Sequence, residues 1–263
     1  MDLDFTKAVK QEEVMSGHSK WANIKNKKEK TDNQRGKIFT KIGREIAIAV
    51  KEGGSDPANN SKLRDVIAKA KASNMPNDNI SRSIKKAAGE LGTINYETGT
   101  YEGYGPGGVA LIVEVLTDNK NRTAAAIRHI FDKYGTGLGN TGCVSWMFER
   151  KGHIVIERSE KFTEDEVMTA AIDAGADDFQ SDEDCYEIFT DPNDFSAVRE
   201  ELENAGYEFL SAEPEMIPNN TIEVTDDETA FKVERIIEMF EDNDDVQKVF
   251  HNALLPDTED EDE

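Results

Sequence analysis

The chain has 263 residues, of which 31 are Lys or Arg and 54 are Asp or Glu, so its formal net charge is −23. Hydrophobic residues make up 37% of it and glycine occupies 19 positions, which is enough apolar material for packed cores and excludes a wholly disordered protein. The longest run without a charged residue, 134–148, has 15 positions and four glycines. It is too short and too polar for a transmembrane helix.

The ends of the chain and its two cysteines indicate a cytoplasmic protein. Residues 1–14 lack the apolar stretch of a secretory signal, and we expect them to be a disordered extension. Cys143 and Cys185 form neither a disulfide framework nor a CxxC pair. The acidic end, 257–263, is predicted to be a disordered tail.

Charge is distributed very unevenly along the chain. Residues 15–90 contain 17 Lys and Arg against 8 Asp and Glu, a net of +9, whereas residues 91–263 contain 12 against 42, a net of −30. A concentrated basic region is typical of nucleic-acid binding, and the acidic remainder would orient the molecule by repulsion. We therefore predict that the first third meets a polyanion.

Residues 16–37 form a basic leader with little apolar material of its own. The cations of such a segment can lie along a phosphate backbone and release its counterions. Its one aromatic residue, Trp21, either stacks on an unpaired base or packs against the helices that follow. Sequence alone leaves both roles of Trp21 open.

Three helices are predicted after the leader. Residues 37–51 show apolar positions at helical spacing opposite a face of Lys and Arg, and a second helical stripe runs from Leu63 to Ala70. A third helix follows Pro76, with Asp78 as its cap and Gly89 at its end. We expect residues 15–90 to form an all-helical basic domain.

The remaining chain is predicted to alternate strands with helices. The helices are expected at 123–135, 163–174, 193–205 and 227–240. Strands are expected at 109–116, 145–150, 153–158, 177–180, 185–189, 207–212, 221–224 and 246–250, the second and third of these being a pair separated at Lys151-Gly152.

This order of elements favours an α+β fold with three domains: a helical basic domain and two acidic ferredoxin-like units, one inserted in the other. The inserted unit is placed at 143–213. The outer unit is made of 91–142 and 214–256.

Motifs for cofactors or catalysis are weak. Gly103, Gly105 and Gly108 fit the letters GxGxxG, but a strand follows them directly, so a turn between strands is the better interpretation. The four histidines lie far apart in sequence, and the acidic runs lack the glycine and final glutamate of a calcium loop. No nucleophile elbow is present. We expect no cofactor, no metal site, no small-molecule substrate and no enzymatic activity.

Five stretches in chain order resemble the YebC/PmpR family, which is related to the mitochondrial translational activator of cytochrome oxidase. They are SGHSKWANIK (16–25), NMPNDNISRSIKK (74–86), EGYGPGGVALIVEVLTDNKNRTAAAIRHIF (102–131), GNTGCVSWMFERKG (139–152) and VQKVFHNA (246–253). The resemblance runs from about residue 15 to 256. Asn77 departs from it, because many relatives have a lysine there, and residues 1–14 precede the usual start.

The resemblance implies a three-domain, non-enzymatic protein that binds nucleic acid. Carried over by position, the first candidates for contact are His18, Ser19, Lys20, Trp21, Lys25, Lys27, Lys28 and Arg35. The remaining candidates lie on the predicted helices: Lys37, Lys41, Arg44, Arg64, Lys71, Arg82, Lys85 and Lys86.

Three functional interpretations remain open. The first is a transcriptional regulator that binds DNA, as members of the family are commonly named. The second is a translation factor that binds ribosomal or messenger RNA and has the ribosome as a partner; it suits an acidic body placed beside basic ribosomal proteins. The third is a protein-binding regulator that acts through the acidic domains.

Overall fold

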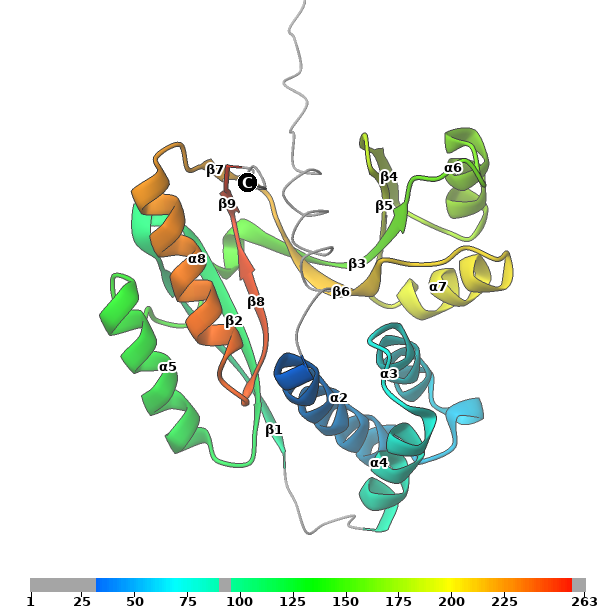
Figure 1. Ribbon diagram of the computed structural model, residues 1–263, viewed down its shortest axis with the longest axis horizontal. Coiled ribbons are helices and arrows are strands. Elements are labelled where there is room, and N and C mark those ends of the chain that lie inside the picture. Colours follow the sequence, from blue (N-terminus) through cyan, green and yellow to red (C-terminus); the bar gives the residue numbers. More distant parts are fainter. Residues whose placement is uncertain (1–31, 90–95, 257–263) are drawn as a thin grey trace, which may run out of the picture.

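The computed structural model of this chain describes residues 32–89 and 96–256, with side chains from residue 35 onwards. The predicted extension 1–14, most of the basic leader and the tail 257–263 lie outside these residues. Figure 1 shows a helical unit beside two units that combine a sheet with helices, so the predicted α+β class is confirmed. None of the described helices combines the length and apolar character needed to cross a membrane.

The helical unit consists of α2 (Asp32–Gly53), α3 (Ser61–Ala72) and α4 (Asn77–Gly89). Its core contains Ile42, Ile46 and Leu63, the apolar positions that the helical spacing places on one face. Buried Asn60 joins the first two helices: its amide donates to the carbonyls of Ala49 (2.7 Å) and Gly54 (2.8 Å), and its oxygen caps α3 by accepting from the Leu63 N–H.

The outer unit is built on a three-stranded antiparallel sheet in the order β1-β2-β8. Both faces of its central strand are buried: alternate residues pack under two helices or on the opposite side of the sheet. This double burial explains the continuous apolar run in that strand. The elements are β1 (Glu97–Tyr104), β2 (Ala110–Thr117), α5 (Lys120–Tyr134), α8 (Asp227–Glu241) and β8 (Val246–His251), with a small parallel pair, β7 (Ile222–Glu223) and β9 (Ala253–Leu254).

The third unit lies in the chain between α5 and α8 and has a four-stranded antiparallel sheet in the order β4-β5-β3-β6. This order and the βαββαβ succession of its elements are those of a ferredoxin-like unit. The elements are β3 (Phe148–Glu157), α6 (Glu164–Asp173), β4 (Asp178–Ser181), β5 (Cys185–Thr190), α7 (Phe195–Asn204) and β6 (Ser211–Pro218). Whether each unit folds independently stays a prediction.

Two predicted strand assignments were wrong. The expected break at Lys151-Gly152 does not exist, because β3 continues through it. A side chain at Gly152 would collide with Thr190 and Phe195, so glycine here permits close packing. The strand expected at 207–212 is displaced to 211–218, because Tyr207 donates its N–H to Leu202 and still belongs to the end of α7.

The GxGxxG segment connects two antiparallel strands, as predicted. After β1 a short 3-10 turn, Pro106–Gly108, leads directly into β2. Gly107 and Gly108 have φ of 67° and 78°, a conformation that favours glycine. The glycines therefore serve backbone geometry at this turn.

Buried Glu102 of β1 organises the loop before β3. Its carboxylate accepts hydrogen bonds from the backbone N–H groups of Gly142 (2.8 Å), Val144 (3.0 Å) and Ser145 (2.8 Å). Burial would raise the pKa of Glu102, but these hydrogen bonds outweigh it and the pKa is lowered. The ionised carboxylate thus holds the loop against the sheet.

We predict that Glu102→Gln lowers the free energy of unfolding at pH 7 by roughly 2–3 kcal/mol, because an amide group would then face backbone donors. Since the folded pKa of Glu102 is depressed, the stabilisation is present above the unfolded pKa and is lost as pH falls. The difference from wild type in urea unfolding should therefore shrink below about pH 4.5. Glu149→Gln, at an exposed position on β3, is the control; equal losses in the two variants would contradict the assignment.

Candidate nucleic-acid interface

Seven of the sequence-predicted contact residues lie outside the described part of the chain: His18, Ser19, Lys20, Trp21, Lys25, Lys27 and Lys28. Their role stays a prediction. The other nine are described, and the structure divides them by what surrounds their side chains. Arg35 is exposed at the start of α2.

Three predicted contacts on α2 face the end of α8 and the turn that follows it. Lys37 forms an ion pair with Asp242 (2.9 Å), and Lys41 donates to the carbonyl of Glu241 (2.8 Å). Arg44 donates to the carbonyl of Asp244 (2.7 Å) and to that of Leu116 (3.1 Å). These cations therefore join the helical unit to the outer unit.

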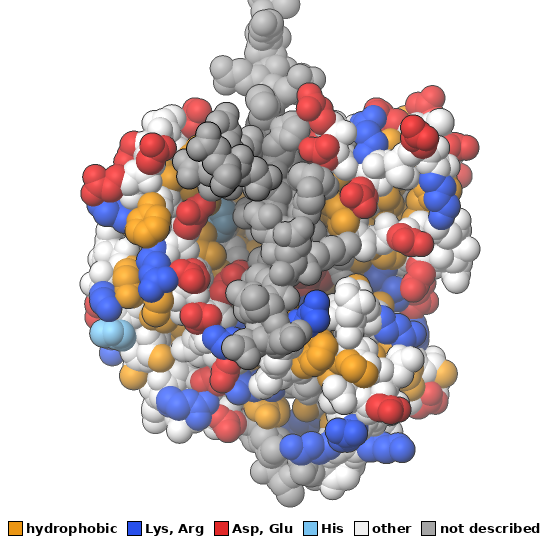
Figure 2. Space-filling model, in the orientation of Figure 1, with side chains coloured by type: hydrophobic (Ala, Val, Ile, Leu, Met, Phe, Trp, Pro, Cys, Tyr) orange, Lys and Arg blue, Asp and Glu red, His pale blue; other side chains and the backbone are white. Residues whose placement is uncertain are grey.

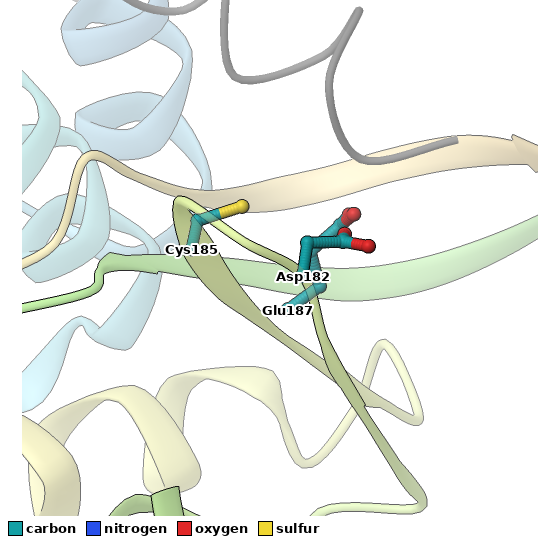
Figure 3. Close-up of side chains that lie close together, drawn as sticks. All are labelled: Asp182, Cys185 and Glu187. Atoms are coloured by element: carbon teal, nitrogen blue, oxygen red, sulfur yellow. The ribbon is translucent and has the colours of Figure 1, made fainter. Parts of the chain in front are cut away.

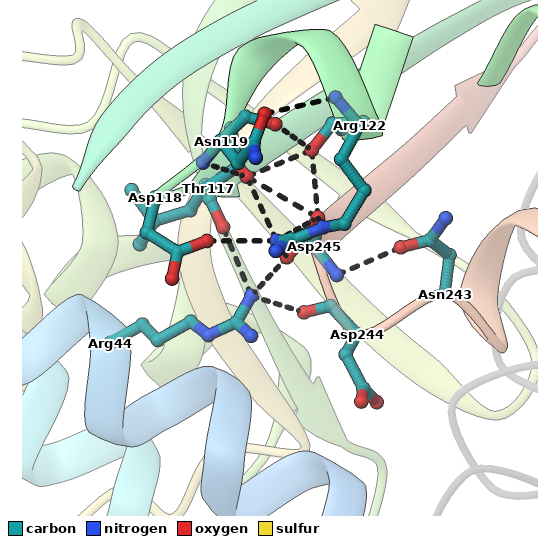
Figure 4. Close-up of polar contacts among 10 residues, drawn as sticks. Arg44, Thr117, Asp118, Asn119, Arg122, Asn243, Asp244 and Asp245 are labelled. Carbon is teal, nitrogen blue, oxygen red and sulfur yellow. Dashed lines mark hydrogen bonds and ion pairs between the residues drawn. The ribbon is translucent and has the colours of Figure 1, made fainter. Parts of the chain in front are cut away.

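Asp245 is the centre of this contact (Figure 4). Its carboxylate, only 7% exposed, accepts from Arg44 (2.8 Å), Arg122 (2.8 Å) and the Thr123 hydroxyl (2.7 Å). Burial would raise the pKa of Asp245, but hydrogen bonds from Arg122, Thr123 and Arg44 lower it. A charge so enclosed depends on its partners, which gives Arg44 a structural role.

A second ionic contact joins the helical unit to the inserted unit through α3. Arg64 is paired with Glu200, and Asp65 accepts from Arg199 (3.0 Å). Arg64 is therefore part of a contact between α3 and α7.

Lys69 lies nearby between Glu45 and Glu213, 2.9 Å from each, and Glu213 also forms an ion pair with Lys248 (2.8 Å). Burial opposes ionisation of Glu213, yet Lys248 and Lys69 lower its pKa to about 2. Burial likewise opposes the charge of Lys69, but Glu213 and Glu45 raise its pKa. Helical, outer and inserted units all contribute to this cluster.

Four predicted contacts remain exposed: Lys71 at the end of α3, and Arg82, Lys85 and Lys86 on α4. None forms an ion pair with another residue in 35–89 or 96–256. The three α4 cations follow i, i+3, i+4 spacing and so share one side of the helix, opposite the apolar positions that pack inward. Figure 2 shows Lys and Arg side chains gathered at the edge of the molecule where α4 lies. We call Lys71, Arg82, Lys85 and Lys86 the α4 face.

One group of potential metal ligands was not anticipated from the sequence. Asp182, Cys185 and Glu187 lie on or beside β5 with their ligand atoms within 4.8 Å of one another (Figure 3). Glu187 also lies 2.6 Å from Nε2 of buried His153 on the neighbouring strand. Burial, with the carboxylates of Glu187 and Asp182, raises the pKa of Cys185 to about 12, which keeps the thiol protonated. Alternation of Cys185 and Glu187 along a strand was the only sequence signal for the cluster.

Comparisons with known proteins cover most of the chain. Residues 19–90 match the family profile described as "TACO1/YebC protein N-terminal domain", and residues 96–253 match "TACO1/YebC second and third domain". A protein of Acetivibrio thermocellus named "Probable transcriptional regulatory protein" is 63% identical over 90% of this chain and 98% of its own length. A Clostridium tetani protein of the same name is 62% identical over 92% and 98%.

A solved structure is also similar. The crystal structure of a conserved hypothetical protein from Aquifex aeolicus aligns with a TM-score of 0.77 and 45% sequence identity. The alignment covers 86% of this chain and 93% of the other. The arrangement of helical, outer and inserted units therefore has a close counterpart in an experimental structure.

We predict opposite phenotypes for two arginines. Arg44→Gln should lower the free energy of unfolding by roughly 1.5–3 kcal/mol, because it removes a charged donor from buried Asp245 and two carbonyls, while nucleic-acid affinity per folded molecule stays unchanged. Arg82→Gln should leave stability within about 0.5 kcal/mol of wild type and weaken binding. Urea unfolding and a binding titration on each variant measure both. A loss of affinity for Arg44→Gln at full stability would show that this side chain contacts nucleic acid.

Proposed function

The chain belongs to the TACO1/YebC family, and on that premise we propose that it regulates gene expression by binding nucleic acid through the α4 face and the basic leader. The family matches confirm the resemblance that the sequence motifs indicated. Relatives named as transcriptional regulatory proteins support a regulatory role. The proposed role is binding and requires no enzymatic activity.

The observation that carries this proposal is the separation of two kinds of cation in the helical unit. Lys37, Lys41, Arg44 and Arg64 are bound to acidic or carbonyl groups of the other units. The α4 face projects from the same unit with its cations in solvent. Exposed lysines and arginines on one helix side can pair with successive phosphates and release counterions.

The composition of the α4 face is better suited to contacts with the phosphate backbone than to recognition of a base sequence. Its side chains are three lysines and one arginine, and the exposed Ser81 next to Arg82 is a small polar residue. Phosphate contacts position a protein on nucleic acid, whereas specificity needs side chains that reach base edges. Any sequence preference would then come from other residues or from the shape of the nucleic acid.

The relatives are named probable transcriptional regulatory proteins, which favours a role in transcription, where the ligand would be DNA. The alternative is a translation factor that binds ribosomal or messenger RNA. It is favoured by the net charge of −30 over residues 91–263, because an acidic body is repelled by naked polyanion yet tolerated where basic proteins surround the RNA.

We predict that Arg82→Glu/Lys85→Glu/Lys86→Glu weakens binding and flattens its salt dependence. Loss of about three phosphate contacts should reduce the slope of log affinity against log salt by about 2 for single strands and nearly 3 for duplex DNA. Fluorescence anisotropy with single-stranded RNA and with duplex DNA, over a salt series, measures both slopes. The fold should persist, because these side chains are exposed.

A matched control keeps net charge equal. Arg128→Glu/Lys133→Glu/Lys232→Glu alters three exposed cations on α5 and α8 by the same total charge. This variant should retain the wild-type slope apart from a small general loss of affinity. If both triple variants behave alike, binding reflects only net charge, and the α4 face is not the interface.

Crosslinking in cells followed by sequencing of the recovered nucleic acid separates transcription from translation. Promoter DNA would support the transcriptional role, and ribosomal or messenger RNA the translational one. We predict that Lys25→Glu/Lys27→Glu/Lys28→Glu in the leader reduces recovery of whichever ligand is found. Undiminished recovery would confine the interface to the α4 face.

A further inference from the structure

An open groove of about 520 Å³ runs along α6 on the surface of the inserted unit. Phe162 and Tyr207 form its aromatic floor, with ring centroids 4.5 Å apart. Tyr207 is held in place because its hydroxyl donates to the carbonyl of Glu166 (3.3 Å). The floor is therefore a fixed apolar surface.

Carboxylates line the groove, and no lining residue is a cation: Asp165, Glu166 and Asp173 come from α6. Glu166 is already engaged, since it accepts from the N–H (2.8 Å) and hydroxyl (2.9 Å) of Thr163 at the helix start. Asp165 and Asp173 form no ion pair within 35–89 or 96–256. Two carboxylates are thus available to a partner.

The residues beside the groove indicate which chemistry suits it. The Lys161 ammonium lies 4.9 Å from the centroid of the Phe162 ring, so this aromatic face already accepts a cation of the chain itself. Thr169 and Ala170 of α6 also line the groove, and their methyl groups offer apolar contact for the methylene stem of a long side chain. The aromatic ring, the carboxylates and these methyl groups together match lysine and arginine.

Charge complementarity identifies the class of partner. Residues 148–218, from the start of β3 to the end of β6, contain 21 acidic and 5 basic residues, a net charge of −16. A field of this sign repels nucleic acid and attracts a basic partner to the groove. We propose that the α6 groove binds an arginine- or lysine-rich segment of a protein partner, with its cations on Asp165 and Asp173 and their stems on Phe162 and Ala170.

The spacing of the two carboxylates sets the spacing of the cations. Asp165 and Asp173 are eight residues apart on α6, or about 12 Å along the helix axis at 1.5 Å per residue. In an extended peptide, side chains four residues apart are separated by about 13 Å. The groove therefore fits a segment with basic residues at positions i and i+4.

The test uses the full-length chain and two fluorescent peptides of equal charge. In the first, three alanines separate two arginines, and in the second the arginines are adjacent. Asp165→Asn/Asp173→Asn is compared with Asp194→Asn/Glu201→Gln, which removes two exposed charges from the α7 region of the same unit. Anisotropy is measured at about 50 mM salt, where screening is weak.

We expect the spaced peptide to bind more tightly than the adjacent one. Its affinity should fall at least about fivefold in the groove variant, which loses two direct ion pairs. It should fall less than about twofold in the control, which changes only the long-range field that salt screens. Ile172→Ser, at an exposed position of α6 that does not line the groove, should leave the affinity unchanged. Equal affinity of both peptides, or equal loss in the two double variants, would show only diffuse attraction and overturn the proposal.

Two further measurements distinguish a peptide site in the groove from a polycation site and from binding at the α4 face. Spermine is titrated as a competitor: if it binds with the same dependence on Asp165 and Asp173 and as tightly as the spaced peptide, the groove takes small polycations and the proposal fails. The variant with glutamates on the α4 face should keep wild-type peptide affinity. Loss of peptide binding there would place the peptide elsewhere, whatever the outcome for nucleic acid.

Discussion

Two enclosed carboxylates hold the three units of this protein together. Asp245 accepts from an arginine of α2 and from an arginine and a threonine of α5. Glu213 lies between lysines of α3 and β8. Charges removed from water are costly unless they are fully paired, so these contacts fix how the helical unit sits on the acidic body. The positions of the α4 face and of the α6 groove follow from that arrangement.

The same ionic contacts divide the basic residues by role. Arginines and lysines of α2 and α3 neutralise carboxylates and helix-end carbonyls, and they contribute to the arrangement of the units. The α4 cations remain in solvent. A protein arranged in this way presents a basic helical surface and, in its inserted unit, a strongly acidic one. The two proposals assign a polyanion to the basic surface and a basic protein segment to the acidic one.

Much of the fold follows from local sequence patterns. The three helices of the basic unit and the helices of the acidic part are found where apolar residues recur at helical spacing. The errors occurred where a single tertiary contact overrides the local pattern. In the sequence, Gly152 indicates a break between strands, but in the structure Thr190 and Phe195 pack closely against it and the strand continues. The apolar residues after α7 resemble a strand in sequence, although Tyr207 closes the helix.

The fold class, the family and the separation of charge could be read from the sequence, because all three lie in the order and periodicity of residue types. Which cations are available to a ligand became visible only in the folded chain. A lysine or arginine has the same propensity and charge whether it faces solvent or a carboxylate 201 residues away, as Arg44 faces Asp245. The α6 groove depends in the same way on the approach of Tyr207 to α6 across the folded chain, a contact that has no local signal.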